Sequence, residues 1–164
     1  MGGTQCGGCG WSSALVLVTH CLRPPMRTPR MSNLASRSVL ADVNFPTASI
    51  CKCGPEEIRA DGLGIPQLLE AILKLLPLDT YVENPAVVME LVSSDKEKGL
   101  QTPVWRSYQS ILWEAGCLSR LTKIERFEFY EEAKKAFAVV ATGETALYGN
   151  LILKKGVLAP EALV

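Results

Sequence analysis

Apolar runs alternate with stretches of helical periodicity from Ser38 onward, and this alternation limits the possible fold more than any other feature of the chain. Residues 38–42 and 137–143 are short runs rich in valine and alanine that end in turn residues, as buried strands do. Residues 67–76 instead carry leucines at helical spacing, directly after Pro66, which suits the first turn of a helix. Helices alternating with apolar strands predict an α/β fold, a layered sandwich with a largely parallel central sheet flanked by helices.

The same pattern predicts the individual elements. Residues 44–49 are expected to form a loop. Ligands of such sheets usually bind beyond the carboxyl ends of the strands, so polar residues at those ends are the first candidates for a functional site. Strands are expected at residues 38–42, 78–82, 86–92, 121–126, 137–143 and 150–156, and helices at residues 67–76, 102–116 and 127–136.

Residues 1–37 differ in composition from the rest of the chain. They are rich in glycine, then in proline and arginine, and show neither a sustained helical period nor a clean strand alternation. We expect them to form an atypical, mostly disordered extension, of the kind that an alternative start of the chain would produce. Residues 38–164 are expected to form one folded domain, for which an apolar fraction of 48% is sufficient.

Charge and hydropathy argue against several classes of function. Lys plus Arg and Asp plus Glu number 17 each, so no basic surplus indicates nucleic acid or an anionic membrane as a partner. The longest apolar runs, at residues 14–18 and 136–141, fall far short of the roughly 20 residues that span a bilayer. No basic residue precedes the first run and no small-residue cleavage site follows it, so secretion is not expected. A small ligand is the better default.

The cysteines and the single histidine match a metal site poorly. A CxxC pair followed at a distance by a CxC pair is a weak fit to zinc-ligand spacing. Reduced thiols of a cytoplasmic protein are the simpler interpretation, and no metal or other cofactor is expected. His20 belongs to the extension and is interpreted as an incidental side chain. The cysteines stand at positions 6, 9, 21, 51, 53 and 117.

Three places in the domain bring polar side chains to the end of an apolar element. Asp42 follows the first strand, and Asp79 follows the leucine-rich helix. Tyr148 and Asn150 flank Gly149 just before the last strand, where the glycine lets the backbone approach another group closely or take a positive φ. Ordinary turns and caps explain the same residues. Periodicity therefore indicates a candidate polar cluster, and it names no substrate.

Longer motifs in the domain resemble a known family. The stretches LADVNFP, IRADGLGIPQLLEAILKLLPLDTY, KIERFEFYEEAKKAFAVVATGE and ALYGNLILKKG closely resemble the fucose mutarotase branch of the fucose mutarotase and ribose pyranase family, and the match runs from about Val39 to Leu158. The resemblance implies an L-fucose mutarotase, an isomerase that interconverts the α and β anomers, on a ribose-pyranase-like fold. It also implies rings of identical subunits, with sites near the subunit interfaces and no metal or organic cofactor.

The resemblance also assigns roles to individual residues. Mutarotation moves one proton from the anomeric hydroxyl and another onto the ring oxygen, so the site needs a base and an acid beside the sugar. Pattern alone leaves Tyr130 as a core tyrosine with a satisfied hydroxyl, whereas the resemblance places it on a catalytic tyrosine of the family. The positions that fall on sugar-binding residues of the family are Asp42, Asp79, Arg126, Tyr148 and Asn150.

The segment upstream of the first strand departs from the family. Members carry Met-Gly-His-Gly-Asp-Glu there, and its histidine, which resembles a general acid, lies eight residues before the aspartate equivalent to Asp42, where this chain has Leu34. His20 stands 22 residues before Asp42 in unrelated sequence, so it can replace that acid only if the extension folds back over the site. Three functions stay open: an active mutarotase relying on Tyr130, a sugar-binding protein without catalysis, or a structural subunit of a ring.

Overall fold

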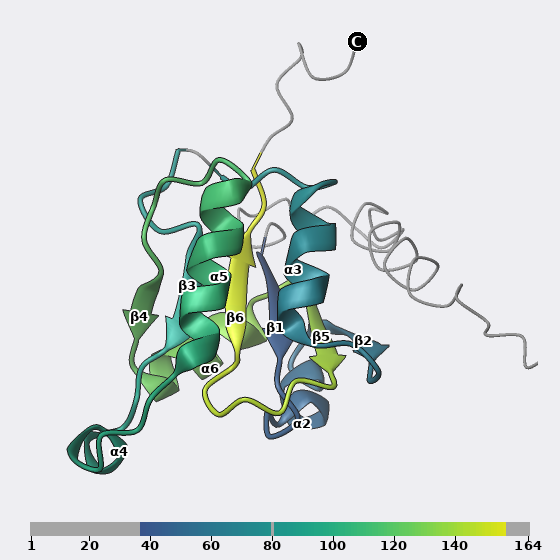
Figure 1. Cartoon of the computed structure of the whole chain (residues 1–164). Coiled ribbons are helices and arrows are strands. Elements are labelled where there is room, and N and C mark those ends of the chain that lie inside the picture. Colours follow the sequence, from purple (N-terminus) through teal and green to yellow (C-terminus); the bar gives the residue numbers. More distant parts are fainter. Residues whose placement is uncertain (1–36, 80, 157–164) are drawn as a thin grey trace, which may run out of the picture.

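A six-stranded mixed sheet lies at the centre of the computed structural model, which describes residues 37–79 and 81–156 (Figure 1). Its strands are β1 (Arg37–Ala41), β2 (Glu56–Ala60), β3 (Ala86–Met89), β4 (Thr122–Ile124), β5 (Ala138–Thr142) and β6 (Leu151–Lys154). They lie in the order β2-β5-β1-β6-β3-β4. β6 runs antiparallel to both of its neighbours, and every other pair is parallel. The largely parallel sheet predicted from the sequence is confirmed.

Helices cover both faces of this sheet. They are α2 (Thr47–Cys51), α3 (Ile65–Leu73), α4 (Ser93–Glu97), α5 (Pro103–Glu114) and α6 (Arg126–Lys134). α3 and α5 pack on one face and α2 and α6 on the other, whereas the short α4 projects away from the sheet (Figure 1). Because successive strand residues point to opposite faces, Leu40 of β1 joins the α3 and α5 side of the core and Val39 joins the α2 and α6 side. The layered sandwich is therefore as predicted.

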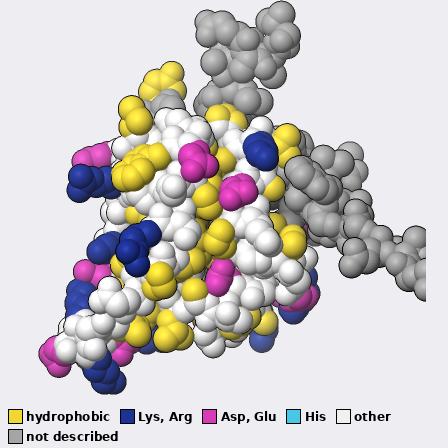
Figure 2. Space-filling model, in the orientation of Figure 1, with side chains coloured by type: hydrophobic (Ala, Val, Ile, Leu, Met, Phe, Trp, Pro, Cys, Tyr) yellow, Lys and Arg dark blue, Asp and Glu magenta, His cyan; other side chains and the backbone are white. Residues whose placement is uncertain are grey.

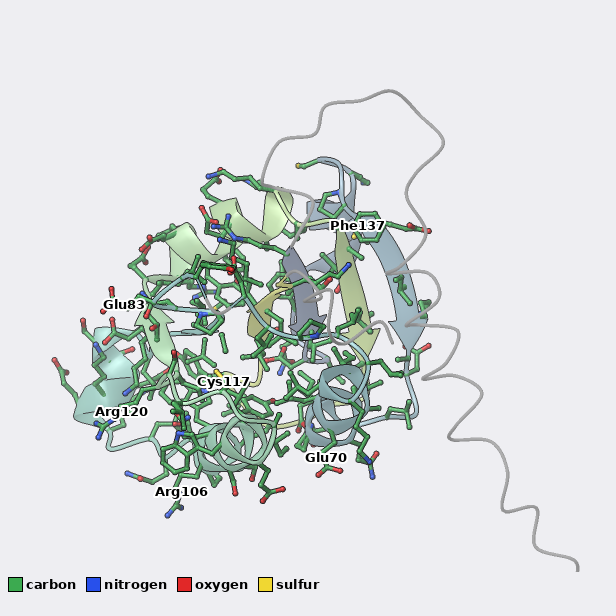
Figure 3. All side chains as sticks on the ribbon, turned by 90° about the horizontal axis from the view of Figure 1, so that it is seen from above. Glu70, Glu83, Arg106, Cys117, Arg120 and Phe137 are labelled. Atoms are coloured by element: carbon green, nitrogen blue, oxygen red, sulfur yellow. The ribbon has the colours of Figure 1, made fainter. Side chains whose placement is uncertain are left out.

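The two longer helices on one face follow their sequence pattern closely. Leu68 of α3 and Tyr108 and Leu112 of α5 are almost completely buried. Each helix has a proline in its first turn, where a missing N–H breaks no hydrogen bond of the helix. Charged side chains such as Glu70 and Arg106 point outward from α3 and α5 (Figure 3). One apolar stripe per helix is enough to fix both against the sheet.

α6 begins at a position fixed by its own cap. The side chain of Glu125 accepts hydrogen bonds from the backbone N–H groups of Phe127 and Glu128, at 2.7 and 3.3 Å. Such a cap satisfies N–H groups that have no partner within the helix. Arg126 is consequently the first residue of the helix, and Tyr130 lies one turn further along the same side.

Several elements differ from the sequence-based prediction. The strand predicted at residues 78–82 is wrong, because Leu78 pairs with Lys155 only in an isolated bridge. The predicted loop at residues 44–49 runs into α2, and β2 and α4 were not predicted. β1 begins at Arg37, one residue before the expected start of the domain. The predicted disordered extension covers residues 1–37, of which residues 1–36 lie outside the described part of the chain. His20 and Leu34 are among them.

The residues that the structure describes contain neither a membrane-spanning helix nor a metal-binding cluster. None of the helices formed by them is long and apolar enough to cross a membrane. Within the same residues, no group of three or more histidine, cysteine or acidic side chains is placed to hold a metal ion.

Candidate functional site

The direction of β6 creates the candidate site. β1 ends at Ala41, and the antiparallel β6 begins at Leu151, with Leu40 paired to Leu151 in the ladder. The residue that follows β1 and the residue that precedes β6 therefore lie side by side at the same end of the sheet. These residues are Asp42 and Asn150, which are 108 positions apart in the sequence.

Asp42 and Asn150 form a reciprocal, buried pair. The backbone N–H of Asp42 donates to Asn150 Oδ1 at 2.9 Å, and Asn150 Nδ2 donates to Asp42 Oδ2 at 2.8 Å. Both residues are at most 5% exposed. The N–H groups of Gly149 and Asn44 also donate to the carboxylate, at 3.1 and 3.0 Å. A carboxylate has about four acceptor positions, so three internal bonds leave capacity for a ligand hydroxyl.

Burial sets the electrostatic character of the Asp42 carboxyl. Loss of solvation raises its pKa, and the nearby Glu144 carboxylate acts in the same direction. The backbone hydrogen bonds from Asn44 and Gly149 oppose that rise because they favour the charged form.

The Tyr148-Gly149 turn is held from behind by α5. The indole Nε1 of Trp105 donates to the carbonyl of Tyr148, and the hydroxyl of Tyr108 donates to the carbonyl of Gly149, both at 2.8 Å. Burial raises the pKa of Tyr108, so its hydroxyl remains a donor. The sequence pattern predicted the helix at residues 102–116 and missed this role of its two aromatic residues, because the periodicity of a helix does not show which backbone groups its side chains meet.

The sequence suggested two roles for Gly149, a close backbone approach or a positive φ. In the structure Gly149 makes the close approach, and Tyr148 has the positive φ. A Cβ on residue 149 would lie 2.9 Å from the carbonyl oxygen of Ala146 and 3.0 Å from Cγ of Glu144, so the close approach requires glycine. The positive φ occurs instead at Tyr148, whose φ is 58°. A left-handed conformation is uncommon for a tyrosine and fixes the direction in which its side chain leaves the backbone.

The hydroxyl of Tyr148 is bound to the connection between β3 and α5. It donates to Asp95 Oδ2 at 2.6 Å and accepts from the backbone N–H of Val92 at 3.4 Å. Burial is the larger cause that raises the pKa of Tyr148, and the hydrogen bond to Asp95 adds to it, while Arg126 acts in the opposite direction. The phenol is therefore held in its neutral form. Nothing in the sequence pattern singled out Asp95, which lies in a charged, exposed segment.

Arg126 and Tyr130 approach this turn from α6. Arg126 Nε donates to the hydroxyl of Tyr130 at 3.4 Å, and its guanidinium lies 5.8 Å from the centre of the same ring. The contact with Tyr130 raises the pKa of Arg126, and a weaker electrostatic interaction couples Arg126 to Tyr148. The ring of Tyr130 packs against Phe45, with centroids 5.7 Å apart. Five of the six predicted site residues thus lie at one end of the sheet.

Asp79 lies at the opposite end of β6. Its backbone N–H donates to the carbonyl of Lys154 at 2.9 Å, and its carboxylate pairs with the Lys154 ammonium at 3.0 Å. The hydrogen bond from Lys154 lowers the pKa of Asp79. Lys154 is four residues beyond Asn150 on an extended strand, which corresponds to roughly 13 Å. A single chain therefore does not bring Asp79 to the other predicted site residues.

The fold is an α/β sheet with a polar cluster at the carboxyl ends of its parallel strands, which is where proteins of this class usually bind a small ligand. A buried carboxylate and amide supply acceptors and a donor, and two phenols and a guanidinium stand beside them. The model of the RbsD / FucU transport protein family matches residues 35–158. The chain belongs to this family.

Individual relatives carry more specific names. The chain is 80% identical over 126 residues to the fucose mutarotase of Homo sapiens, covering 77% of this chain and 82% of the relative. It is 45% identical over 120 residues to the L-fucose mutarotase of Histophilus somni strain 2336, covering 73% and 79% of the two chains.

Solved structures agree with these sequence relatives. A crystal structure of the fucose mutarotase from Streptococcus pneumoniae in complex with L-fucose superposes with a TM-score of 0.73 at 41% identity, covering 88% of this chain and 93% of that chain. Bacillus subtilis RbsD complexed with D-ribose gives a TM-score of 0.57 at 18% identity, covering 97% and 100%, and shares the fold. The family and the ribose-pyranase-like fold predicted from the sequence are confirmed.

Proposed function

We infer that the chain is an L-fucose mutarotase, an isomerase that interconverts the α and β anomers by opening and closing the sugar ring. The observation that carries this inference is the buried Asp42–Asn150 pair beside Tyr148, in a chain 80% identical over 126 residues to the fucose mutarotase of Homo sapiens. The bound L-fucose named for the Streptococcus pneumoniae structure supports the same ligand class.

The proposed site divides binding from proton transfer. Asp42, Asn150 and Tyr148 bind sugar hydroxyls, and Arg126 adds a charged donor at the rim. Tyr130 exchanges the proton: because Arg126 donates to its oxygen, the phenol keeps its own hydrogen for the sugar ring oxygen. In ring opening a water molecule accepts the proton of the anomeric hydroxyl while Tyr130 donates its proton to the ring oxygen, and ring closure returns both protons.

Free thiols are consistent with a cytoplasmic location. Of the cysteines that the structure describes, Cys51, Cys53 and Cys117 are free. Free thiols are the usual state in a reducing compartment, which supports the proposal that the protein acts in the cytoplasm.

Anomer exchange measured by saturation-transfer NMR tests this function. We expect the protein to transfer saturation between the anomeric signals of L-fucose, and Tyr130→Phe to lower the exchange rate by about 10²- to 10⁴-fold while the affinity changes much less. Tyr81→Phe is the matched control, since Tyr81 is 91% exposed. Fucose binding without any exchange in the parent would favour the alternative, a sugar-binding or structural ring subunit without catalysis.

Assembly of identical subunits would give Asp79 a place in the site. We propose that the protein forms a ring and that Asp79 of one copy serves the Asp42 cluster of the next, since a single chain keeps the two about one strand length apart. Asp42→Ala and Asp79→Ala should each impair exchange, and mixing the two variants should restore part of it, because some mixed interfaces hold both intact residues. Light scattering that reports only monomer, or mixing that restores nothing, would remove Asp79 from the site.

A further inference from the structure

The hydroxyl of Tyr148 is tied to the projecting connection that carries α4. Asp95 Oδ2 accepts its hydrogen at 2.6 Å, and the N–H of Val92 reaches its oxygen at 3.4 Å. An ion pair of 2.8 Å between Lys96 and Glu90 links α4 to the segment directly after β3. Charged side chains of both signs gather over α4 (Figure 2), and Asp95 is the member of this group that turns toward the site.

The geometry leaves Tyr148 one way to meet a ligand. A phenol has a single hydrogen to donate, and this hydrogen lies on the bond to Asp95. The side chain is held at both ends, because the Trp105 indole and a left-handed φ fix the backbone of Tyr148 and the Val92 N–H donates to the phenol oxygen. The remaining freedom is rotation of the hydroxyl. The residue that accepts the hydrogen therefore decides whether the oxygen or the hydrogen faces the sugar.

We propose that Asp95 is a positioning residue that turns the Tyr148 hydroxyl hydrogen away from the ligand, so that the phenol oxygen accepts a hydrogen bond from a fucose hydroxyl. This proposal rests on the proposed function and adds a residue to it. It also explains how Tyr148 complements Asn150: the amide keeps a donor beside the Asp42 carboxylate, and the phenol is restricted to accepting.

The surrounding charges favour a neutral phenol in this arrangement. Burial raises the pKa of Tyr148, and the bond to the Asp95 carboxylate raises it further, while Arg126 from α6 has the opposite influence. The ammonium of Lys98 lies 4.0 Å from Asp95 Oδ1 and places a positive charge beside that carboxylate. Removal of the Asp95 charge should therefore lower the pKa of Tyr148, because the charge of Arg126 is then less opposed.

A double-mutant cycle tests the role of Asp95. Asp95→Ala should weaken L-fucose binding by about tenfold, as expected for loss of a charge-assisted hydrogen bond that orders a ligand contact. Asp95→Asn retains an acceptor oxygen and should keep most of the affinity. In a Tyr148→Phe background Asp95→Ala should cause no further loss. Glu97→Gln, two residues away on the same short helix, is the control. The proposal would be overturned if Asp95→Ala and Tyr148→Phe lowered the affinity independently, so that the fold-losses multiplied in the double variant. It would also be overturned if Asp95→Ala bound L-fucose as tightly as Glu97→Gln.

A titration without sugar separates this proposal from the proposed function. In protein labelled with ¹³C at tyrosine Cζ, Tyr148 should titrate at lower pH in Asp95→Asn than in the parent, and Glu97→Gln should leave it unchanged. A parent that fails to bind L-fucose would defeat the proposed function, while the titration would still report on the Asp95 contact. An unchanged Tyr148 titration in Asp95→Asn would show that Asp95 does not hold the hydroxyl and would defeat the positioning role.

Discussion

Asp42→Ala should weaken L-fucose binding by about 10- to 100-fold and lower the free energy of unfolding by at least about 2 kcal/mol. The two effects have one cause. The substitution removes the acceptor shared by the N–H groups of Asn44 and Gly149 and the amide of Asn150. Each unsatisfied buried donor costs about 1–3 kcal/mol, and the turn that carries Tyr148 loses its anchor to β1.

Asp61→Ala is the matched control for this experiment. Asp61 follows the parallel strand β2 as Asp42 follows β1, but its carboxylate is exposed and pairs with Arg59 on the surface, at 2.6 Å. An exposed pair of this kind contributes less than about 1 kcal/mol. Chemical denaturation and sugar titration of both variants compare the two positions. An Asp42→Ala protein with the affinity and stability of the parent would show that the buried pair neither binds sugar nor supports the turn.

The second large effect concerns the position of Leu34, where the resemblance to the family implies a histidine. A chimera carrying the Met-Gly-His-Gly-Asp-Glu segment and its leading helix in place of the residues before Arg37 should exchange anomers about 10²- to 10⁴-fold faster than the parent. The added imidazole would supply the second proton-transfer group, while the contacts to the sugar proposed for Asp42 and Asn150 would stay unchanged. Affinity should change far less than rate.

The same chimera with leucine in place of its histidine is the control. It supplies the helix and the remaining segment without the imidazole, so a gain that persists would come from folding or assembly rather than from acid catalysis. His20→Ala in the parent should have no effect. If the parent already matches the histidine chimera, the missing histidine is dispensable; an inactive His20→Ala variant would show that the extension supplies the acid.

The parts of the fold that follow a strong period could be predicted from the sequence. β1 and β5 are buried on both faces, and α3 and α5 each carry one apolar stripe, so their patterns are unambiguous. β2 was missed because it is an edge strand with charged residues at three of its five positions. α4 buries no residue, and its helical state leaves no periodic signal in the sequence.

The sequence pattern identified part of the candidate site, and the family resemblance added Arg126 and Tyr130. Pattern identified Asp42 and Asn150 as strand-end residues, but their pairing depends on the antiparallel direction of β6. Two parallel strands would have placed these two residues at opposite edges.

Trp105 binds the carbonyl of Tyr148, and Asp95 binds its hydroxyl. Both contacts join segments that are distant in the sequence and meet only after the sheet has formed. Asp79 shows the opposite case. The resemblance grouped it with the other site residues, but within one chain it lies at the other end of β6.

The position of β6 links the synthesis of residues 151–154 to the formation of the candidate site. β6 is the last strand of the described chain, yet it lies inside the sheet and joins β1, β2 and β5 to β3 and β4. A nascent chain can pair each of these two groups as it leaves the ribosome, but it cannot join them until residues 151–154 have emerged. Asp42 lacks its partner until the same moment. A chain released before Asn150 would expose unpaired strand edges and would lack the buried Asp42–Asn150 pair, so truncated products would favour aggregation over partial function.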